Sequence, residues 1–447
     1  MHTMNLIYIS KRLSIPFVMA LLLPVHSIWA QDQQPSPYLL SIEDALKLSK
    51  DNNWIAIAKL KSESSLSDLK EIKSSALPDI VIAADGMKLT DVTLFQNGIS
   101  SSETIPVPPS PYKAALGLQA AINLYSGGRQ LAANQEYNVR TKLADINLKE
   151  QTGNISLQVI QNYLQILRLS RLDTLYNEQI KREESRLKNI NSFYKNGKIT
   201  RSDVLRAEIN LSNQQFSKKE NESNISIYYD RLDILLHLPE KTRLILTDTI
   251  IAYIPDHTTI ESFTEKKSYR ALTAQQNTEL QQSRVKSAKS NYYPSIDLIT
   301  GYEYNYPNNL VFPNVDQIFA YGFIGFKMRY SISSLYHNNH KVHAEKQRLE
   351  EARINESAVN DNIRLQISLL NTQIEIMTNK ITLAKQNIEQ SKMNYKIVNT
   401  KYNNQLALLT DLLDADDLYL QSKYRLIEAQ ADLQNYYYQL LYTTGNL

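Results

Sequence analysis

The chain has 447 residues, of which 43% are apolar, and it carries a formal charge of +3 at pH 7. It contains no cysteine, which excludes a disulfide framework, a zinc–cysteine centre, a thiol nucleophile and the lipid attachment point of a bacterial lipoprotein. The nearly balanced charge gives no indication of nucleic-acid binding, and the low Gly and Pro content argues against disorder.

The N-terminus has the pattern of a secretory signal peptide. A basic pair, Lys11 and Arg12, precedes the apolar stretch LSIPFVMALLLPVHSIWA, which ends on the small residue Ala30. The alternative is an N-terminal membrane anchor, but the two prolines in this stretch would break a spanning helix. We therefore expect residues 1–30 to be removed, which lowers the formal charge from +3 to +1.

Long helices are predicted by long stretches without proline. No proline occurs between Pro111 and Pro239, and none follows Pro313. We predict helices over about 42–76, over 128–194 and, after a turn at Asn196-Gly197, on to 238, and then over 262–291, 339–403 and 410–443. Within 339–403 the apolar residues follow a heptad pattern, namely Ile363, Ile367, Leu370, Ile374, Met377, Ile381, Ala384 and Ile388.

Four stretches between these helices alternate apolar and polar residues. They cover 79–86, 116–124, 295–306 and 321–332, and the first alternates only weakly. Alternation over about ten residues, with aromatic residues near the strand ends, is typical of a transmembrane β-barrel. A half-buried sheet of a soluble protein gives the same alternation, so the strands alone leave both interpretations open.

The two halves of the chain repeat one pattern. Pro78 and Pro294 each end a helix and open a strand, and Leu335-Tyr336 is expected to close the fourth strand as Leu124-Tyr125 closes the second. Tyr194, Asp203, Leu205 and Ala207 recur 208 residues later as Tyr402, Asp411, Leu413 and Ala415. The predicted organisation is a signal peptide at 1–30, a first repeat at 31–239, a linker with a short strand or two at 240–261, and a second repeat at 262–447.

The predicted fold class is mainly α with some β, built from long antiparallel helical hairpins and an internal two-fold repeat. Four strands cannot close a barrel, and lipid does not tolerate open sheet edges. A membrane barrel would therefore have to be shared between copies of the chain. Two copies would supply about eight strands and three about twelve; an eight-stranded barrel is filled by its own side chains, so a conducting pore favours three or more.

The layout resembles the TolC-like outer-membrane efflux protein family. The resemblance covers nearly the whole mature chain and rests on the ALPDI and YYPSI helix–strand junctions, LYSGGR after the second strand, and YKNGKITRSDVLRAE with its partner YNNQLALLTDLLDAD. It implies a homotrimer with a shared 12-stranded transmembrane β-barrel in outer-membrane lipid and an α-barrel tunnel in the periplasm. It also implies a periplasmic adaptor protein and an inner-membrane pump as partners. The chain would then be the exit duct of a tripartite efflux or type I secretion system. The alternative is a periplasmic coiled-coil protein, structural or adhesive, without a channel.

Three positions depart from the family pattern. The paired glycines after the second strand are present as Gly127 and Gly128, but Asn338-Asn339 replaces them in the second repeat. Because Asn tolerates a left-handed backbone, we expect that turn to survive. The glycine of the hairpin motif is present as Gly197 but is Gln405 in the second repeat, and the family's arginine is Ala407.

The resemblance places the periplasmic constriction at Asp411 and Asp414. A spacing of three puts both carboxylates on one helix face, and three copies would form a ring of six, which attracts cations. The alternative is that these acids only offset the dipole at a helix start. Leu409, Leu412, Leu413 and Leu420 should pack on the other side, and we expect Asp416 and Asp417 to be surface or capping residues.

The resemblance also predicts contacts that close the hairpin end, formed by Tyr402 and Asp203. Ala407 cannot form the bonds of the family's arginine, and Arg201 or Arg206 on the neighbouring hairpin is a candidate replacement.

His337, His340 and His343 could hold a metal, but on a helix they spread widely and are better explained as polar surface or lumen residues. We find no phosphate-binding glycine loop, no HExxH and no nucleophile elbow, so we predict no enzyme, no cofactor and no metal.

Overall fold

The computed structural model describes residues 38–95, 98–107, 109–239, 242–249, 264–308, 310, 313 and 315–447. The predicted signal peptide and most of the predicted linker at 240–261 lie outside these residues. Among the described residues, no helix is both long enough and apolar enough to span a membrane.

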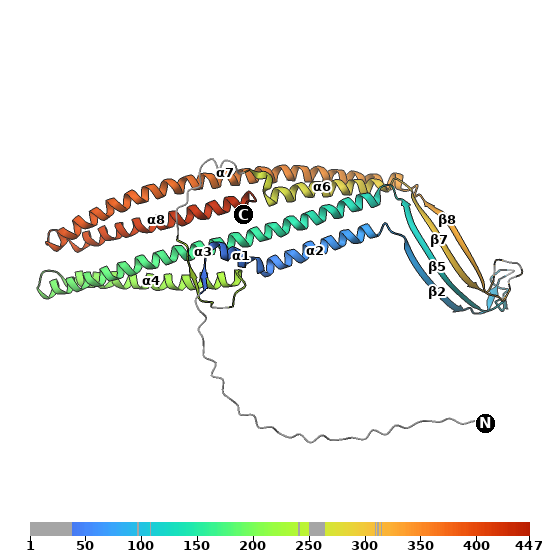
Figure 1. The fold of residues 1–447 in the computed structure, drawn as a ribbon, viewed down its shortest axis with the longest axis horizontal. Helices are drawn as coiled ribbons and strands as arrows, with labels where there is room; N and C mark the ends of the chain where they lie inside the picture. Colours follow the sequence, from blue (N-terminus) through green and yellow to red (C-terminus); the bar gives the residue numbers. More distant parts are fainter. Residues whose placement is uncertain are drawn as a thin grey trace, which may run out of the picture.

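The molecule is a long rod of helices with a curved sheet at one end (Figure 1). The first half contains α2 (Asn53–Ser74), β2 (Asp79–Lys88), β5 (Tyr112–Tyr125), α3 (Arg129–Lys195) and α4 (Arg201–Leu235). The second half contains α6 (Tyr269–Ser290), β7 (Ser295–Tyr306), β8 (Phe319–Arg329), α7 (Ser334–Asn403) and α8 (Leu409–Thr443). At about 1.5 Å per residue, the 67 residues of α3 span about 100 Å.

Shorter elements also occur among the described residues. They are β1 (Tyr38–Leu40), α1 (Ile42–Leu48), the 3₁₀ turns η1 (Ser49–Asp51) and η2 (Glu265–Lys267), β3 (Val92–Leu94), β4 (Glu103–Ile105) and β6 (Leu244–Leu246). Within the predicted linker, β6 pairs in parallel with β1. The sequence did not predict the hairpin of β3 and β4.

The predicted continuous helix over 42–76 is wrong, because it breaks at Asn52. The Asn52 side chain accepts a hydrogen bond from the Trp54 amide at 2.9 Å and donates one to the Leu235 carbonyl at 3.0 Å. It therefore caps α2 and ties its start to the end of α4. The second bond joins residues 183 positions apart, which no local pattern reveals.

The helices form one curved layer (Figure 1). Away from the sheet the order is α7, α8, α3, α4, and toward the sheet it is α7, α6, α3, α2. Both α8 and α3 therefore have a neighbour on each side, while α4 and α7 form the two edges. The predicted heptad positions face inward as expected, with Ile363, Ile374, Met377, Ile381 and Ala384 buried.

The four long strands form one antiparallel sheet in the order β2-β5-β7-β8, at the four predicted places. Cross-strand partners share a face, so the registers sort the side chains. Apart from Lys88 at the end of β2, one face carries only apolar residues, Thr, Tyr and Gly, including the register partners Ile82 with Leu118 and Leu298 with Phe326. The other face carries the polar residues, where Asn123 donates to Asp297 at 2.7 Å and Gln119 donates to Glu303 at 2.7 Å.

The second repeat leaves its sheet differently from the first. In the first repeat, Gly127 and Gly128 have positive φ, and α3 begins at Arg129. In the second, β8 ends at Arg329 and α7 begins at Ser334, so Leu335-Tyr336 and Asn338-Asn339 are helical. The expected strand end and left-handed turn there are both wrong. Asn338 is buried instead, and its Nδ2 donates to the Ala288 carbonyl at 2.8 Å.

Candidate functional site

The candidate site is the end of the rod far from the sheet, where the α3–α4 and α7–α8 hairpins turn. We call this end the tip; it comprises residues 190–208 and 398–416. Gly197 has φ of 70° and Gln405 has φ of 63°. Their amides donate to the carbonyls of Tyr194 and Tyr402, both at 2.9 Å. The same left-handed turn thus ends both long helices, although the second repeat has Gln where Gly is favoured.

The helices that return from the tip begin differently. Thr200 caps α4, because its side chain accepts from the Asp203 amide and the Asp203 carboxylate accepts from the Thr200 amide at 3.0 Å. At the start of α8, Leu408 has no polar side chain to act as a cap. Only one of the two reciprocal hydrogen bonds remains there: the Asp411 carboxylate accepts from the Leu408 amide at 3.0 Å.

The predicted constriction residues Asp411 and Asp414 are both exposed. Asp411 already has the local role described above, whereas the Asp414 carboxylate forms no hydrogen bond or ion pair with the described residues. The four leucines expected to pack are buried, as predicted: Leu409, Leu412, Leu413 and Leu420. One chain thus presents two carboxylates on the exposed side of α8, and their assignment to a constriction stays a prediction.

The predicted tip contacts are not hydrogen-bonded within one chain. Tyr402 is buried in an apolar cluster with Val204, Ala207 and Leu409, and its hydroxyl has no partner among the described residues. Burial, and then the nearby charge of Asp203, raise the pKa of Tyr402. Tyr402 and Asp203 therefore lie near each other, as predicted, but form no hydrogen bond within one chain.

The candidate replacements for the missing arginine lie on α4. Arg206 is exposed and forms no ion pair within the described chain, and Arg201 lies 4.0 Å from Glu208 on its own helix. Ala407 itself packs against the apolar cluster of the tip. Within a single chain, neither arginine takes over the missing role.

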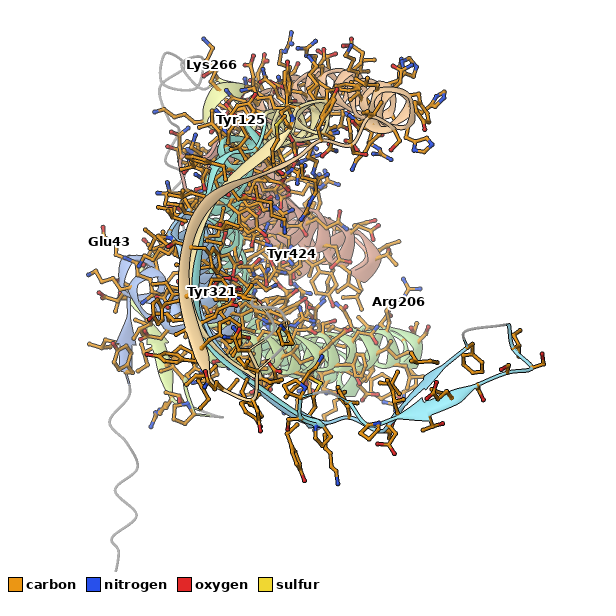
Figure 2. All side chains as sticks on the ribbon, turned by 90° about the vertical axis from the view of Figure 1, so that its right-hand side faces the viewer. Glu43, Tyr125, Arg206, Lys266, Tyr321 and Tyr424 are labelled. Atoms are coloured by element: carbon orange, nitrogen blue, oxygen red, sulfur yellow. The ribbon has the colours of Figure 1, made fainter. Side chains whose placement is uncertain are left out.

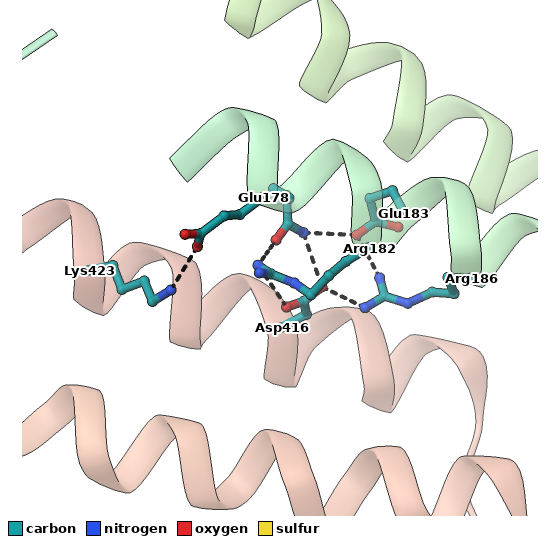
Figure 3. Close-up of polar contacts among 7 residues, drawn as sticks. Glu178, Arg182, Glu183, Arg186, Asp416 and Lys423 are labelled. Carbon is teal, nitrogen blue, oxygen red and sulfur yellow. Dashed lines mark hydrogen bonds and ion pairs between the residues drawn. The ribbon is translucent and has the colours of Figure 1, made fainter. Parts of the chain in front are cut away.

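The expectation that Asp416 is a surface or capping residue is wrong. It is 1% exposed and lies between α8 and α3 (Figure 3). Its Oδ2 accepts from Arg186 Nη2 at 2.5 Å and from Gln179 Nε2 at 3.0 Å, and Arg182 Nη2 lies 3.8 Å from its Oδ1. The signal available in the sequence was its position among the inward-facing leucines of α8.

A second carboxylate completes this buried network. Glu183, on α3, accepts from Arg186 Nη1 at 2.6 Å and from Gln179 Nε2 at 2.8 Å. Burial raises the pKa of Glu183 to about 7, with the charge of Asp416 adding to the rise and that of Arg186 opposing it. We call Gln179, Arg182, Glu183, Arg186 and Asp416 the inter-hairpin network, since it joins the first hairpin to the second.

The predicted junction residues lie between the sheet and the helices. Pro78 directly precedes β2 and Pro294 directly precedes β7. At Gly127 a Cβ atom would lie 2.6 Å from the Ser290 carbonyl oxygen, so no larger residue fits there without a shift. Gly128, with φ of 83°, precedes the first residue of α3.

The three histidines lie at the sheet end of α7. His337, His340 and His343 are exposed. Among the described residues, no group of three or more His, Asp or Glu side chains is arranged to hold a metal ion.

Solved structures of outer-membrane channels share this architecture. The outer membrane protein VceC of Vibrio cholerae has a TM-score of 0.74 at 15% identity, over 90% of this chain and 96% of that one. The Campylobacter jejuni CmeC outer membrane channel has a TM-score of 0.72 at 16% identity, over 91% and 85%. The open state of the Neisseria gonorrhoeae MtrE outer membrane channel has a TM-score of 0.72 at 14% identity, over 90% and 88%.

The chain has the TolC-like fold. The predicted resemblance is therefore confirmed at the level of architecture, from the helical rod to the four strands. No protein-family model matches the sequence, and no curated protein matches it. At these identities, function has to be argued from the TolC-like fold and from this chain's own residues.

Proposed function

We propose that this chain is one protomer of a trimeric outer-membrane channel, the exit duct of a tripartite efflux or type I secretion system. The observation that carries the proposal is the sheet, which has one exposed apolar face and two unpaired edges, at β2 and β8. Ile82, Ile324 and Phe326 on the apolar face are each at least 74% exposed. Such a surface is stable in lipid once its edges are paired.

A ring of copies pairs those edges. Because the strands alternate in direction, β8 of one copy can pair antiparallel with β2 of the next. Three copies would close a barrel of twelve strands with the apolar face toward lipid and the polar face inside. The solved structures compared above, which share this architecture, are outer-membrane channels, which supports this arrangement.

The helical layer is also built for a ring. Its two edge helices carry exposed apolar residues at roughly heptad spacing. On α4 these are Leu205, Ile209, Phe216, Ile227 and Ile234, and on α7 they are Leu365, Leu369, Ile376, Leu383 and Ile397. Because the stripes lie on opposite edges, α4 of one copy would pack against α7 of the next. Such head-to-tail contacts close into rings.

The proposed gate is at the tip. Three copies of Asp411 and Asp414 would ring the narrow end, where they attract cations or bind one that blocks the channel. The inter-hairpin network would hold the α7–α8 hairpin against the α3–α4 hairpin in the closed state. Energy for transport would come from an inner-membrane pump through a periplasmic adaptor, and the duct itself would catalyse nothing.

Cysteine cross-linking tests the assembly without background, since the chain has no cysteine of its own. Ile209→Cys on α4 and Met393→Cys on α7 place one thiol on each edge at similar heights above the tip. In detergent extracts of outer membranes, a bis-maleimide reagent is expected to join them into covalent dimers and trimers. Each single-cysteine variant is the control and should stay monomeric on a denaturing gel. A soluble periplasmic monomer, without cross-links, would contradict the proposal and favour the non-channel alternative.

A further inference from the structure

A hollow of about 470 Å³ lies where the sheet meets the helices. Its wall comes from three places in the chain, namely the β5–α3, α6–β7 and β8–α7 connections. Tyr125, labelled in Figure 2, is the last residue of β5 and directly precedes Ser126, which lines the hollow. Two wall residues, Ser295 and Arg329, are register partners on the polar face of the sheet. The hollow therefore opens on the polar face.

The wall is basic. Its charged side chains are Arg129, Arg329 and Lys341, with His337 as a further titratable group, and the lining contains no Asp or Glu. His337 and Lys341 are one turn apart on α7, so they lie on the same side of that helix. The other polar groups are neutral, on Ser126, Asn291, Tyr293, Ser295, Ser331, Ser333, Ser334 and Asn338. Ser334 donates to the Ser331 carbonyl, the Ser331 and Ser333 hydroxyls bond to each other, and Asn338 donates to the Ala288 carbonyl, so the hydroxyls of Ser126, Tyr293 and Ser295 are the ones left to donate.

The three permanent cations have no carboxylate partner in the described chain. Arg129 donates one hydrogen bond, from Nη2 to Asn291 Oδ1 at 2.9 Å, which fixes its guanidinium and leaves further N–H groups free. Arg329 and Lys341 form no ion pair with the described residues. Asp297, one step along the polar face from Ser295, already accepts from Asn123. An unpaired cluster of this kind favours an anion.

Two helices begin at this wall, which adds to the positive potential. α3 starts at Arg129 and α7 starts at Ser334, and both residues line the hollow. The free N–H groups of a helix start carry partial positive charge. Their contribution is secondary to the side chains, but it has the same sign and comes from two directions.

We propose that this hollow binds phosphate groups, as inorganic phosphate or as the phosphate of a solute in transit. Two guanidinium groups, one ammonium and several hydroxyls provide the charged and neutral donors that a tetrahedral oxyanion accepts. The location inside the duct rests on the function proposed above, because the polar face becomes interior only when the barrel closes. Three copies then form a basic ring at the base of the barrel.

Ring closure brings one opposing charge. When β8 of one copy pairs with β2 of the next, Asp79 at the start of β2 comes close to the end of β8, on the polar face. One carboxylate against Arg129, Arg329 and Lys341 leaves each hollow positive. The site therefore remains an anion site in the closed barrel.

Phosphate titration of the full-length protein in detergent tests the site. At constant ionic strength, with phosphate replacing chloride, we expect saturable binding by calorimetry. The double variant Arg329→Gln/Lys341→Gln should weaken that binding at least tenfold. Lys346→Gln/Lys385→Gln removes the same charge from exposed positions elsewhere on α7 and should leave binding unchanged.

The outcomes separate the possible sources of the phosphate group. Equal binding by the wild type and the double variant, or none by either, overturns the proposal. A lipid source predicts phosphatidylglycerol bound in native mass spectrometry and lost in the double variant, with no response to inorganic phosphate; this overturns the solute site. Failure of the proposed duct would appear independently, as an absence of cross-linked trimers, whatever the phosphate result.

Discussion

The two hairpins reach the same tip with different local stability. The α3–α4 hairpin turns on Gly197 and starts its returning helix with a side-chain cap from Thr200. The α7–α8 hairpin turns on Gln405, in a left-handed conformation that costs a non-glycine residue about 1–2 kcal/mol. Leu408, at the N-cap position of its returning helix, lacks a capping side chain, a loss worth about 1 kcal/mol.

The weaker hairpin is also the one that carries the candidate gate. Asp411 and Asp414 lie on α8, and Asp416, two residues further, joins α8 to α3. The equivalent position in the first repeat is Glu208, which is exposed on the edge helix α4. The comparison teaches that a duplicated helix acquires a different role once its neighbours differ. In the second hairpin, a poor local turn is combined with a strong long-range attachment.

Breaking that attachment should have the largest effect. Arg186→Met leaves Asp416 and Glu183 buried without their shared guanidinium, which is expected to cost about 3–5 kcal/mol. The measurement is hydrogen-exchange protection of the first turns of α8 in the purified channel. Arg182→Met is the comparison within the same network: Arg182 is 28% exposed, lies 3.8 Å from Asp416 and donates to Gln179, so its loss should cost less, about 1 kcal/mol.

A second variant separates the network from general packing. Arg186→Met/Glu183→Gln/Asp416→Asn removes all three charges together and should recover most of the lost protection, because no buried charge is left unpaired. Equal losses in the triple and single variants would show that the shape of Arg186 matters and not its charge.

The acidic face of the second hairpin predicts an intermediate effect, mainly on current, although Asp411→Ala also removes the carboxylate that accepts from the Leu408 amide at the start of α8. Asp411→Ala/Asp414→Ala should raise the divalent-cation concentration for half-block from the periplasmic side by about tenfold, equivalent to about 1.4 kcal/mol. The matched control is Glu208→Ala, an exposed acid on α4 of the first hairpin. Unchanged block of single-channel current in the double variant would refute the assignment of these residues to the constriction.

How far the sequence predicted this molecule depended on how local each feature was. The heptad pattern from Ile363 to Ile388 and the strand alternation depend on neighbouring residues, and both are found as predicted. The break at Asn52 and the burial of Asp416 depend on partners 183 and 230 residues away. Repeat symmetry also misled at Asn338, because α7 starts before the position equivalent to the glycine turn.

The smallest effect should come from exchanging the turn residues, and the sign of the stability change should differ between the two turns. Gln405→Gly relieves the left-handed strain and should stabilise the second turn by about 0.5–1 kcal/mol, while Gly197→Ala should destabilise the first by about 1 kcal/mol. Asn404→Gly is the control: its φ is −90°, so a glycine there only adds chain entropy and should destabilise. Proteolysis rates at the two turns provide the measurement.

Opposite signs at 197 and 405 would show that the second repeat retained the fold of the turn after losing the residue that suits it, and that the strain is local. A destabilising Gln405→Gly would instead mean that the Gln405 side chain makes a contact in the assembled channel. The turn of the α7–α8 hairpin would then be stabilised by a neighbouring copy.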